Sequence, residues 1–232
     1  MGRSTVSVAE HETGVRPPIV AMVTGRSPVT AIAGDAAPLD ALAAAIGRAA
    51  RAGVDLVQVR EPDLDGGDLL ALATRAMHEA RGTTARIVIN DRVDVALAAR
   101  AHGVHLPARA VAASRVRAIA PEPFLIGRSV HSVEEAIGAE RDGHCDYLIF
   151  GTVFASASKP PGHMISGVEA LARVCSAVRL PVLAIGGMTV DRAAAVAEAG
   201  AGGIAAIGLF ADGEEDELRE RIRAIRAAFR RD

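Results

Sequence analysis

Residues 146–159 read DYLIFGTVFASASK, an apolar segment that passes into a short hydroxyl-rich loop. The first half is rich in β-branched and aromatic residues, which predicts a buried strand. Ser156, Ser158 and Lys159 follow it and can all face one anionic group. Two hydroxyls and an ammonium at the end of a buried strand suit a phosphate or diphosphate. The alternative is an ordinary polar loop, because short loop motifs have many false positives.

Seven further segments resemble this strand, and helical segments alternate with them. The expected strands cover residues 18–25, 54–60, 86–90, 103–106, 124–130, 147–154, 181–185 and 203–210. The expected helices cover residues 39–52, 66–82, 93–101, 110–119, 167–178, 190–199 and 214–230, with one more after Ser132, where Glu135 completes a capping-box pattern. Repeated strand–helix units without a linker predict a single α/β domain, a (β/α)8 TIM barrel over residues 18–232, after a loosely ordered tail at 1–17. The alternative, an open doubly wound sheet, lacks the expected G-x-G-x-x-G turn after the first strand.

The composition excludes several classes of function. The 232 residues carry a net charge of -2 and include five Phe, one Tyr and no Trp. A chain with no basic footprint and few aromatic rings for base stacking is not expected to bind nucleic acid. No apolar run is long enough to span a membrane, and residues 1–15 lack the apolar core of a signal peptide, so we expect a cytoplasmic protein. Without a C-x-x-C motif, Cys145 and Cys175 are expected to be buried, reduced thiols.

Polar residues gather at the carboxyl ends of the expected strands, where barrel enzymes build their active sites. In chain order they are Gln58, Arg60, Asn90, Asp91, His105, Ser129 and His131. Gly186 and Gly187 end the seventh strand, and Ala206 and Ile207 lie at the eighth. Exposed backbone amides in these last two loops form the usual phosphate site of a barrel, and glycine lets a phosphate approach the main chain.

Each of these polar residues also has a structural explanation. Arg60 could form an ion pair with Glu61 at the barrel rim, and Asp91 could cap the helix that begins near Val93. His131 could act as a general acid or base, or only orient other groups through hydrogen bonds. Because all of these side chains converge on one rim, the sequence predicts an active site there.

Six motifs in a fixed order resemble the thiamine phosphate synthase/TenI superfamily. They are VQVRE at 57–61, INDRVDVA at 89–96, GVHL at 103–106, GRSVHS at 127–132, GTVF with the following Ser158 and Lys159, and AIGGM at 184–188. The resemblance extends from about residue 18 to residue 210 and implies a (β/α)8 barrel, in agreement with the strand pattern.

The resemblance also implies a reaction. Synthases of this family join hydroxymethylpyrimidine diphosphate to a thiazole phosphate and release diphosphate, with Mg²⁺ holding the leaving group. The resemblance assigns the diphosphate to Arg60, Asn90, Ser129 and Lys159, and the metal to Asp91. It assigns binding of the thiazole phosphate to Ser156, Ser158 and Gly187 and to the amides of Ala206 and Ile207. Their positions at the strand ends make Gln58 and Gly186 further candidates for substrate binding and His131 a candidate for catalysis. The expected partners are therefore small phosphorylated pyrimidine and thiazole molecules.

Three positions depart from the family pattern and leave two alternative functions open. Pro62 stands where synthases usually carry Lys, and residues 106–109 lack an acidic metal ligand. The TenI branch, which contains thiazole tautomerases, uses His where this chain has Thr152. A tautomerase would need His131 or another group as a replacement. The second alternative is a non-catalytic binder of thiazole phosphate or thiamine phosphate.

The terminal helix carries an apolar stripe made by Leu218, Ile222, Ile225 and Phe229 at helical spacing. Such a stripe packs against another surface, either the barrel itself or a second copy of the chain. The sequence therefore leaves homo-oligomer formation open.

Overall fold

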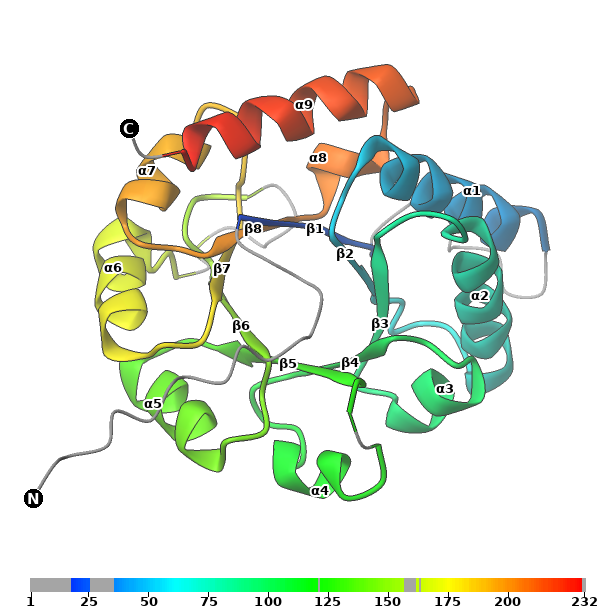
Figure 1. Ribbon diagram of the computed structural model, residues 1–232, viewed down its shortest axis with the longest axis horizontal. Helices are drawn as coiled ribbons and strands as arrows, with labels where there is room; N and C mark the ends of the chain where they lie inside the picture. Colours follow the sequence, from blue (N-terminus) through cyan, green and yellow to red (C-terminus); the bar gives the residue numbers. More distant parts are fainter. Residues whose placement is uncertain (1–17, 26–35, 121, 157–161, 163, 231–232) are drawn as a thin grey trace, which may run out of the picture.

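A computed structural model describes residues 18–25, 36–120, 122–156, 162 and 164–230. All strands are parallel and close into a barrel in chain order, so that β1 pairs with β8 as well as with β2 (Figure 1). The strands are β1 (Ile19–Val23), β2 (Leu56–Val59), β3 (Arg86–Asn90), β4 (Gly103–Leu106), β5 (Leu125–Val130), β6 (Tyr147–Gly151), β7 (Val182–Ile185) and β8 (Gly203–Ala206). The predicted (β/α)8 barrel is confirmed. The expected tail at residues 1–17 lies outside the described residues.

Helices surround the barrel on its outer side, as Figure 1 shows. They are α1 (Ala36–Ala52), α2 (Gly66–Glu79), α3 (Val93–Ala98), α4 (Ala113–Arg117), α5 (Val133–Asp142), α6 (Gly167–Ala177), α7 (Ala193–Glu198), α8 (Gly208–Ala211) and α9 (Glu215–Ala228). In the part of the chain that the structure describes, one helix follows each strand from β1 to β7, whereas two follow β8.

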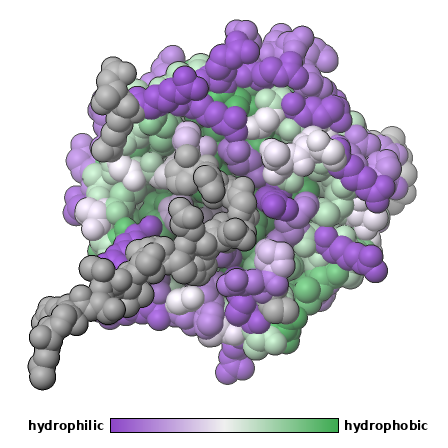
Figure 2. Space-filling model, viewed as in Figure 1, coloured by the Kyte–Doolittle hydropathy of each residue, from purple (hydrophilic) through white to green (hydrophobic). Residues whose placement is uncertain are grey.

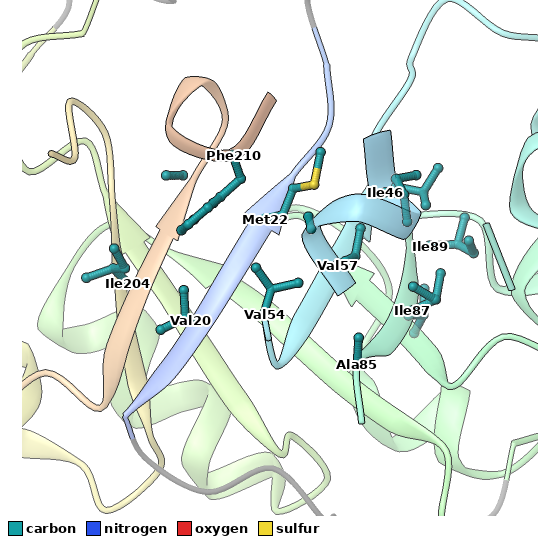
Figure 3. Packing of buried hydrophobic residues seen from close by; sticks show 14 of the residues in the cluster. Val20, Met22, Ile46, Val54, Val57, Ala85, Ile87, Ile89, Ile204 and Phe210 are labelled. Carbon is teal, nitrogen blue, oxygen red and sulfur yellow. The ribbon is translucent and has the colours of Figure 1, made fainter. Parts of the chain in front are cut away.

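Alternation along the strands sorts the apolar residues into two layers. Side chains that point into the barrel form an inner cluster made by Ile19, Ala21, Val23, Leu56, Val88, Leu125, Tyr147, Ile149, Leu183 and Ala205. Their neighbours along each strand point outward and pack against the helices; Figure 3 shows Val20, Met22 and Val57 in this outer layer with Ile46 of α1. Strands buried on both faces explain why the sequence shows continuous apolar runs rather than simple alternation.

The helix-start signal at Ser132 works largely as expected. The Ser132 side chain accepts a hydrogen bond from the backbone N–H of Glu135 and begins α5. Glu135 does not return the bond to Ser132; its carboxylate accepts the backbone N–H of His131 instead. The cap therefore also holds the loop that carries His131.

The eighth expected strand is shorter than predicted. The segment 203–210 was expected to be one strand, but β8 ends at Ala206 and Gly208 begins the short helix α8. Phe210 of α8 is buried in the outer layer. Similarly, β6 ends at Gly151 instead of residue 154. Apolar residues continue past both strand ends, into the helix α8 after β8 and into a loop after β6, so hydrophobicity alone misplaced both ends.

Two aspartates fasten the amino-terminal end of the barrel. Asp55, just before β2, accepts the backbone N–H of Val20 at 2.8 Å and pairs with Arg226 of α9 at 2.7 Å. Asp146, just before β6, accepts the backbone N–H of Ile126 at 2.6 Å and pairs with Arg117 at 3.2 Å. Each aspartate thus joins its own strand to the preceding strand and to a helix.

The terminal helix α9 packs on the barrel assembly against α1 and α7. Leu218, Ile222 and Ile225 are buried along its inner face, and hydrophilic residues dominate the surface over this helix in Figure 2. The apolar stripe is therefore used largely within the chain. No helix of the described residues is long and apolar enough to cross a membrane.

Candidate functional site

Four polar side chains form the innermost layer at the carboxyl end of the barrel. Gln58, Asn90, His105 and Ser129 belong to four consecutive strands, β2 to β5. Each follows the inward-facing alternation of its strand, for example Gln58 after Leu56 and Asn90 after Val88. The structure thus brings together four of the residues that the sequence placed at strand ends.

Gln58 and Asn90 form a pair that orients both amides. The Gln58 Nε2 donates to the Asn90 Oδ1 at 2.9 Å, and Gln58 is almost completely buried. Because the oxygen of Asn90 is occupied by this bond, its amino group remains as the donor at the barrel mouth. An anion at the mouth would therefore meet N–H groups rather than a carbonyl oxygen.

His105 and Ser129 form a second pair, and Tyr147 of β6 joins them. The His105 Nε2 lies 2.8 Å from the Ser129 Oγ, and its Nδ1 lies 3.3 Å from the Tyr147 hydroxyl. The sequence pattern indicates Tyr147 only as a residue of the sixth strand. Tyr147 is the one tyrosine of the chain, and this was the feature of the sequence that could have marked it as a candidate site residue.

The buried imidazole makes the stability of the protein pH-dependent. Burial, reinforced by the charge of Arg128, lowers the pKa of His105 to about 3. The unfolded chain therefore takes up a proton at His105 below about pH 6.5, while the folded chain does so only near pH 3. We expect the free energy of unfolding to fall by about 2 kcal/mol from this group between pH 7 and pH 5.

Urea unfolding at both pH values in the wild type and in His105→Asn measures this contribution. The variant should lose about 2 kcal/mol less than the wild type on acidification. His102, whose pKa is also lowered by burial, is present in both proteins and cancels in the comparison. Equal losses in the two proteins would contradict the assignment to His105.

Arg60 lies exposed at the rim, directly after β2. Its backbone N–H donates to the Thr24 Oγ1 at 2.8 Å, which ties the ends of β1 and β2 together. The expected alternative of an Arg60–Glu61 ion pair is wrong, because the ion pairs among the described residues do not include it. Glu61 is instead buried with its Oε1 unpartnered, and burial raises its pKa.

Asp91 adopts a left-handed backbone conformation with a φ of 63°. Its backbone N–H donates to the carbonyl of His105 at 2.9 Å, and its side chain is exposed. The alternative that Asp91 caps α3 is wrong, since Arg92 occupies the N-cap position and no side chain caps the helix. Aspartate is one of the few residues that tolerate this conformation, which occurs often at functional sites.

His131 is exposed at the end of β5, and its ring orientation is set by β6. The Nδ1 donates to the carbonyl of Gly151 at 2.9 Å, because a carbonyl can only accept. The Nε2 is therefore the ring nitrogen left for contact with a ligand.

Gly186 and Gly187 both have a positive φ, at 103° and 61°. A Cβ atom at Gly187 would lie 2.2 Å from the carbonyl oxygen of Ala155, and one at Gly186 would lie 2.4 Å from the Thr152 side chain. The glycines are thus required because the loop after β6 packs directly on the loop after β7. Ala206 ends β8, and Ile207 stands at the N-cap position of α8 beside them.

Ser156 lies in the described part of the loop after β6. Ser158 and Lys159 fall outside the described residues, so their assignment to phosphate binding rests on the sequence. Both cysteines are free; Cys145 is buried in the loop before β6, and Cys175 is half-buried in α6.

The side chains at the barrel mouth fit a Mg²⁺ site in which most of the ligands come from the substrate. Within the described ranges, no group of three or more His, Cys, Asp or Glu side chains could hold a metal ion. Mg²⁺ often binds through one or two carboxylates together with substrate phosphates and water. Asp91 at the barrel mouth fits a site of that kind, in which the diphosphate supplies the remaining ligands.

The chain is similar to known proteins over most of its length. The family described as thiamine monophosphate synthase matches residues 29–210. The thiamine-phosphate synthase of Methanoculleus marisnigri is 41% identical over 188 residues, which cover 78% of this chain and 88% of that protein. The thiamine-phosphate synthase of Caldanaerobacter subterraneus is 37% identical over 191 residues, covering 82% of this chain and 88% of that protein.

Solved structures agree with these similarities. The thiamine phosphate pyrophosphorylase from Pyrococcus furiosus superposes with a TM-score of 0.73 at 28% identity, covering 91% of this chain and 96% of that one. A 3-hexulose-6-phosphate synthase, at 18% identity and a TM-score of 0.61, shares the fold alone. The predicted family is confirmed: the chain belongs to the thiamine monophosphate synthase/TenI family.

Proposed function

We propose that the chain is a thiamine-phosphate synthase, a transferase that joins hydroxymethylpyrimidine diphosphate to thiazole phosphate and releases diphosphate. Relatives with 36% to 41% identity over most of the chain carry that name. The observation that carries the proposal is the layer of Gln58, Asn90, His105 and Ser129 at the barrel mouth, with Arg60 and Asp91 around it.

In this reaction negative charge develops on the departing diphosphate. Fixed N–H and O–H donors and cations that face the departing group lower the barrier, because they interact more strongly with the transition state than with the ground state. The amino group of Asn90, the hydroxyl of Ser129 and the guanidinium of Arg60 supply such donors. Lys159, by sequence, adds a second cation. When bound, Mg²⁺ supplies Lewis-acid stabilisation of the leaving group, with Asp91 as its protein ligand.

The thiazole phosphate would bind across the loops after β7 and β8. Backbone N–H groups near Gly187, Ala206 and Ile207, with Ser156 and Ser158, are the assigned donors. Barrel enzymes commonly bind phosphate in these two loops. This placement puts the thiazole on the side of the mouth opposite β3 and β4, so that it faces the pyrimidine across the barrel.

The proposal is tested by incubating the purified protein with hydroxymethylpyrimidine diphosphate and thiazole phosphate, with and without Mg²⁺. Thiamine phosphate formed together with an equal amount of diphosphate is the expected result. Tight binding of thiazole phosphate without product would instead support the non-catalytic binder.

Asp91 should set the metal requirement of this reaction. We expect Asp91→Asn to raise the Mg²⁺ concentration for half-maximal rate by at least about 10-fold, since loss of groups around a metal typically lowers affinity 10- to 100-fold. Asp94→Asn is the matched control, because the Asp94 carboxylate is paired with Arg92 and lies on α3. Identical Mg²⁺ curves for the wild type and Asp91→Asn would remove Asp91 from the metal site.

A second candidate activity is thiazole tautomerisation, which the geometry of His131 favours. Its Nδ1 is held by Gly151, so the Nε2 has a fixed direction from which it could exchange a proton with a bound thiazole. This function predicts that His131→Ala abolishes tautomerisation of thiazole carboxylate phosphate. The synthase function predicts thiamine phosphate formation by the same variant, because capture of the pyrimidine by the thiazole nitrogen requires no base.

A further inference from the structure

Three side chains inside the barrel form a continuous chain of hydrogen-bonding groups. Tyr147, His105 and Ser129 come from β6, β4 and β5, and the two contacts measure 3.3 Å and 2.8 Å. His105 is 1% and Tyr147 4% exposed, so neither is in contact with bulk water. Only Ser129, at the end of the chain of contacts, is partly exposed.

Gly127 makes this arrangement possible. In the sheet register His105 pairs with Gly127, and Gly127 pairs with Tyr147, so the tyrosine and the histidine lie on either side of a glycine. A Cβ atom at Gly127 would lie 2.1 Å from the Tyr147 Cζ and 2.4 Å from its hydroxyl oxygen. The phenol therefore lies across β5 and reaches a histidine two strands away. The rings are 5.7 Å apart between centroids.

The positions of the protons follow from this geometry. The buried Tyr147 hydroxyl must donate its hydrogen, and among the described residues its hydrogen-bond contact is the His105 Nδ1. In a neutral imidazole one nitrogen accepts and the other donates. If Nδ1 accepts, Nε2 carries the hydrogen and donates to the Ser129 Oγ. The reverse order would leave a buried phenolic hydrogen unsatisfied, which is unfavourable.

The imidazole stays neutral throughout the physiological pH range, since burial lowers the pKa of His105 to about 3. The direction of donation from Tyr147 through His105 to Ser129 is therefore the same at any pH near 7.

We propose that Tyr147 and His105 are positioning residues that fix the Ser129 hydroxyl as a hydrogen-bond donor toward the diphosphate. With the Nε2–H of His105 donated to its oxygen, Ser129 directs its own hydrogen into the barrel mouth. A serine that donated to His105 would present only oxygen lone pairs there, which repel an anion. The proposal rests on the proposed function, because it takes diphosphate to be the group that Ser129 contacts.

Binding of inorganic pyrophosphate in the presence of Mg²⁺, measured by calorimetry, tests the role of the three residues. Ser129→Ala should weaken binding by roughly 10- to 100-fold, as expected for loss of a hydrogen bond to a charged group. Tyr147→Phe, which removes one oxygen from a buried ring, should weaken it by about 10-fold. The double variant should bind no more weakly than Ser129→Ala, because Tyr147 acts only through that hydroxyl.

Unchanged affinity in Tyr147→Phe, or additive losses in the double variant, would overturn the proposal. Thermal unfolding of each variant separates a folding defect from a binding defect. A general loss of packing would lower the affinity of the double variant below that of Ser129→Ala. A loss of the donation from Tyr147 through His105 to Ser129 would not, because the double variant has no Ser129 hydroxyl to orient.

¹⁵N NMR of the histidine rings gives a readout that does not depend on the reaction. The wild type should carry its His105 hydrogen on Nε2, and Tyr147→Phe should shift it at least partly to Nδ1. A wild-type hydrogen on Nδ1 would overturn the proton order directly. Failure of the wild type to bind pyrophosphate, with the hydrogen on Nε2, would overturn the proposed function while supporting the proton order.

Discussion

Replacing Arg60 with alanine should slow thiamine phosphate formation by about 100- to 1,000-fold, the usual effect of removing one donor from a site where charge develops. Arg60 is a cation at the rim, two residues after Gln58 of the Gln58–Asn90 pair, and its backbone N–H is bound by the Thr24 hydroxyl at 2.8 Å. The residue two positions further on is Pro62, which carries no charge that could replace the guanidinium. Steady-state rates at saturating substrate and Mg²⁺ measure the effect.

Two further variants make the result specific to the guanidinium. Arg60→Lys keeps the charge but loses the planar fork of donors, so it should recover only part of the rate. Arg81→Ala is the matched control, since Arg81 is exposed in the loop before β3 at the opposite end of the barrel. A rate for Arg60→Ala close to that of Arg81→Ala would exclude Arg60 from the diphosphate site.

Asp146→Ala should lower the free energy of unfolding by about 3–5 kcal/mol, the usual cost of removing one partner of a buried ion pair. The side chains of Arg117 and Asp146 are only 15% and 6% exposed. Burial raises the pKa of Asp146 despite the nearby arginine, so the pair itself adds little net stability. The loss arises because the variant leaves the Arg117 charge without its carboxylate partner and the backbone N–H of Ile126 without its acceptor.

Urea unfolding followed by circular dichroism checks this expectation. Asp94→Ala is the control, because its ion pair with Arg92 is exposed, at 67% and 43%, and exposed pairs contribute about 0–1 kcal/mol. Asp146→Asn keeps an acceptor for Ile126 and should fall between the two. Equal stability of Asp146→Ala and Asp94→Ala would show that the amino-terminal end of the barrel does not depend on this contact.

The fold was predictable because the physical signals in this chain are repeated and consistent. The strands are short, mostly apolar runs, and two of the helices between them begin at a side-chain cap, Asp65 for α2 and Ser132 for α5. The strands were predicted from their apolar runs, and the same criterion placed the end of β8 too far along the chain. Residues 203–210 are apolar throughout, but the chain turns helical at Gly208, and Phe210 of that helix packs in the outer layer.

The location of a site residue was predictable where the position of the residue along its strand determines where its side chain lies. Gln58, Asn90 and Ser129 were placed correctly at the barrel mouth, because all carboxyl ends of parallel strands meet there. Tyr147 was missed, since it lies near the start of β6 and reaches His105 only across a glycine of another strand. Such a contact depends on the register of three strands, which a single sequence does not specify.

The fastening of β1 has a consequence for synthesis on the ribosome. β1 is made before every other strand of the barrel, yet one of its edges pairs with β8, and the aspartate that binds its backbone is held by Arg226 of α9. Until β8 has emerged from the ribosome, β1 therefore carries an unpaired edge. Closure of the barrel waits for the synthesis of β8, and a nascent chain truncated before that strand would be a natural substrate for chaperones.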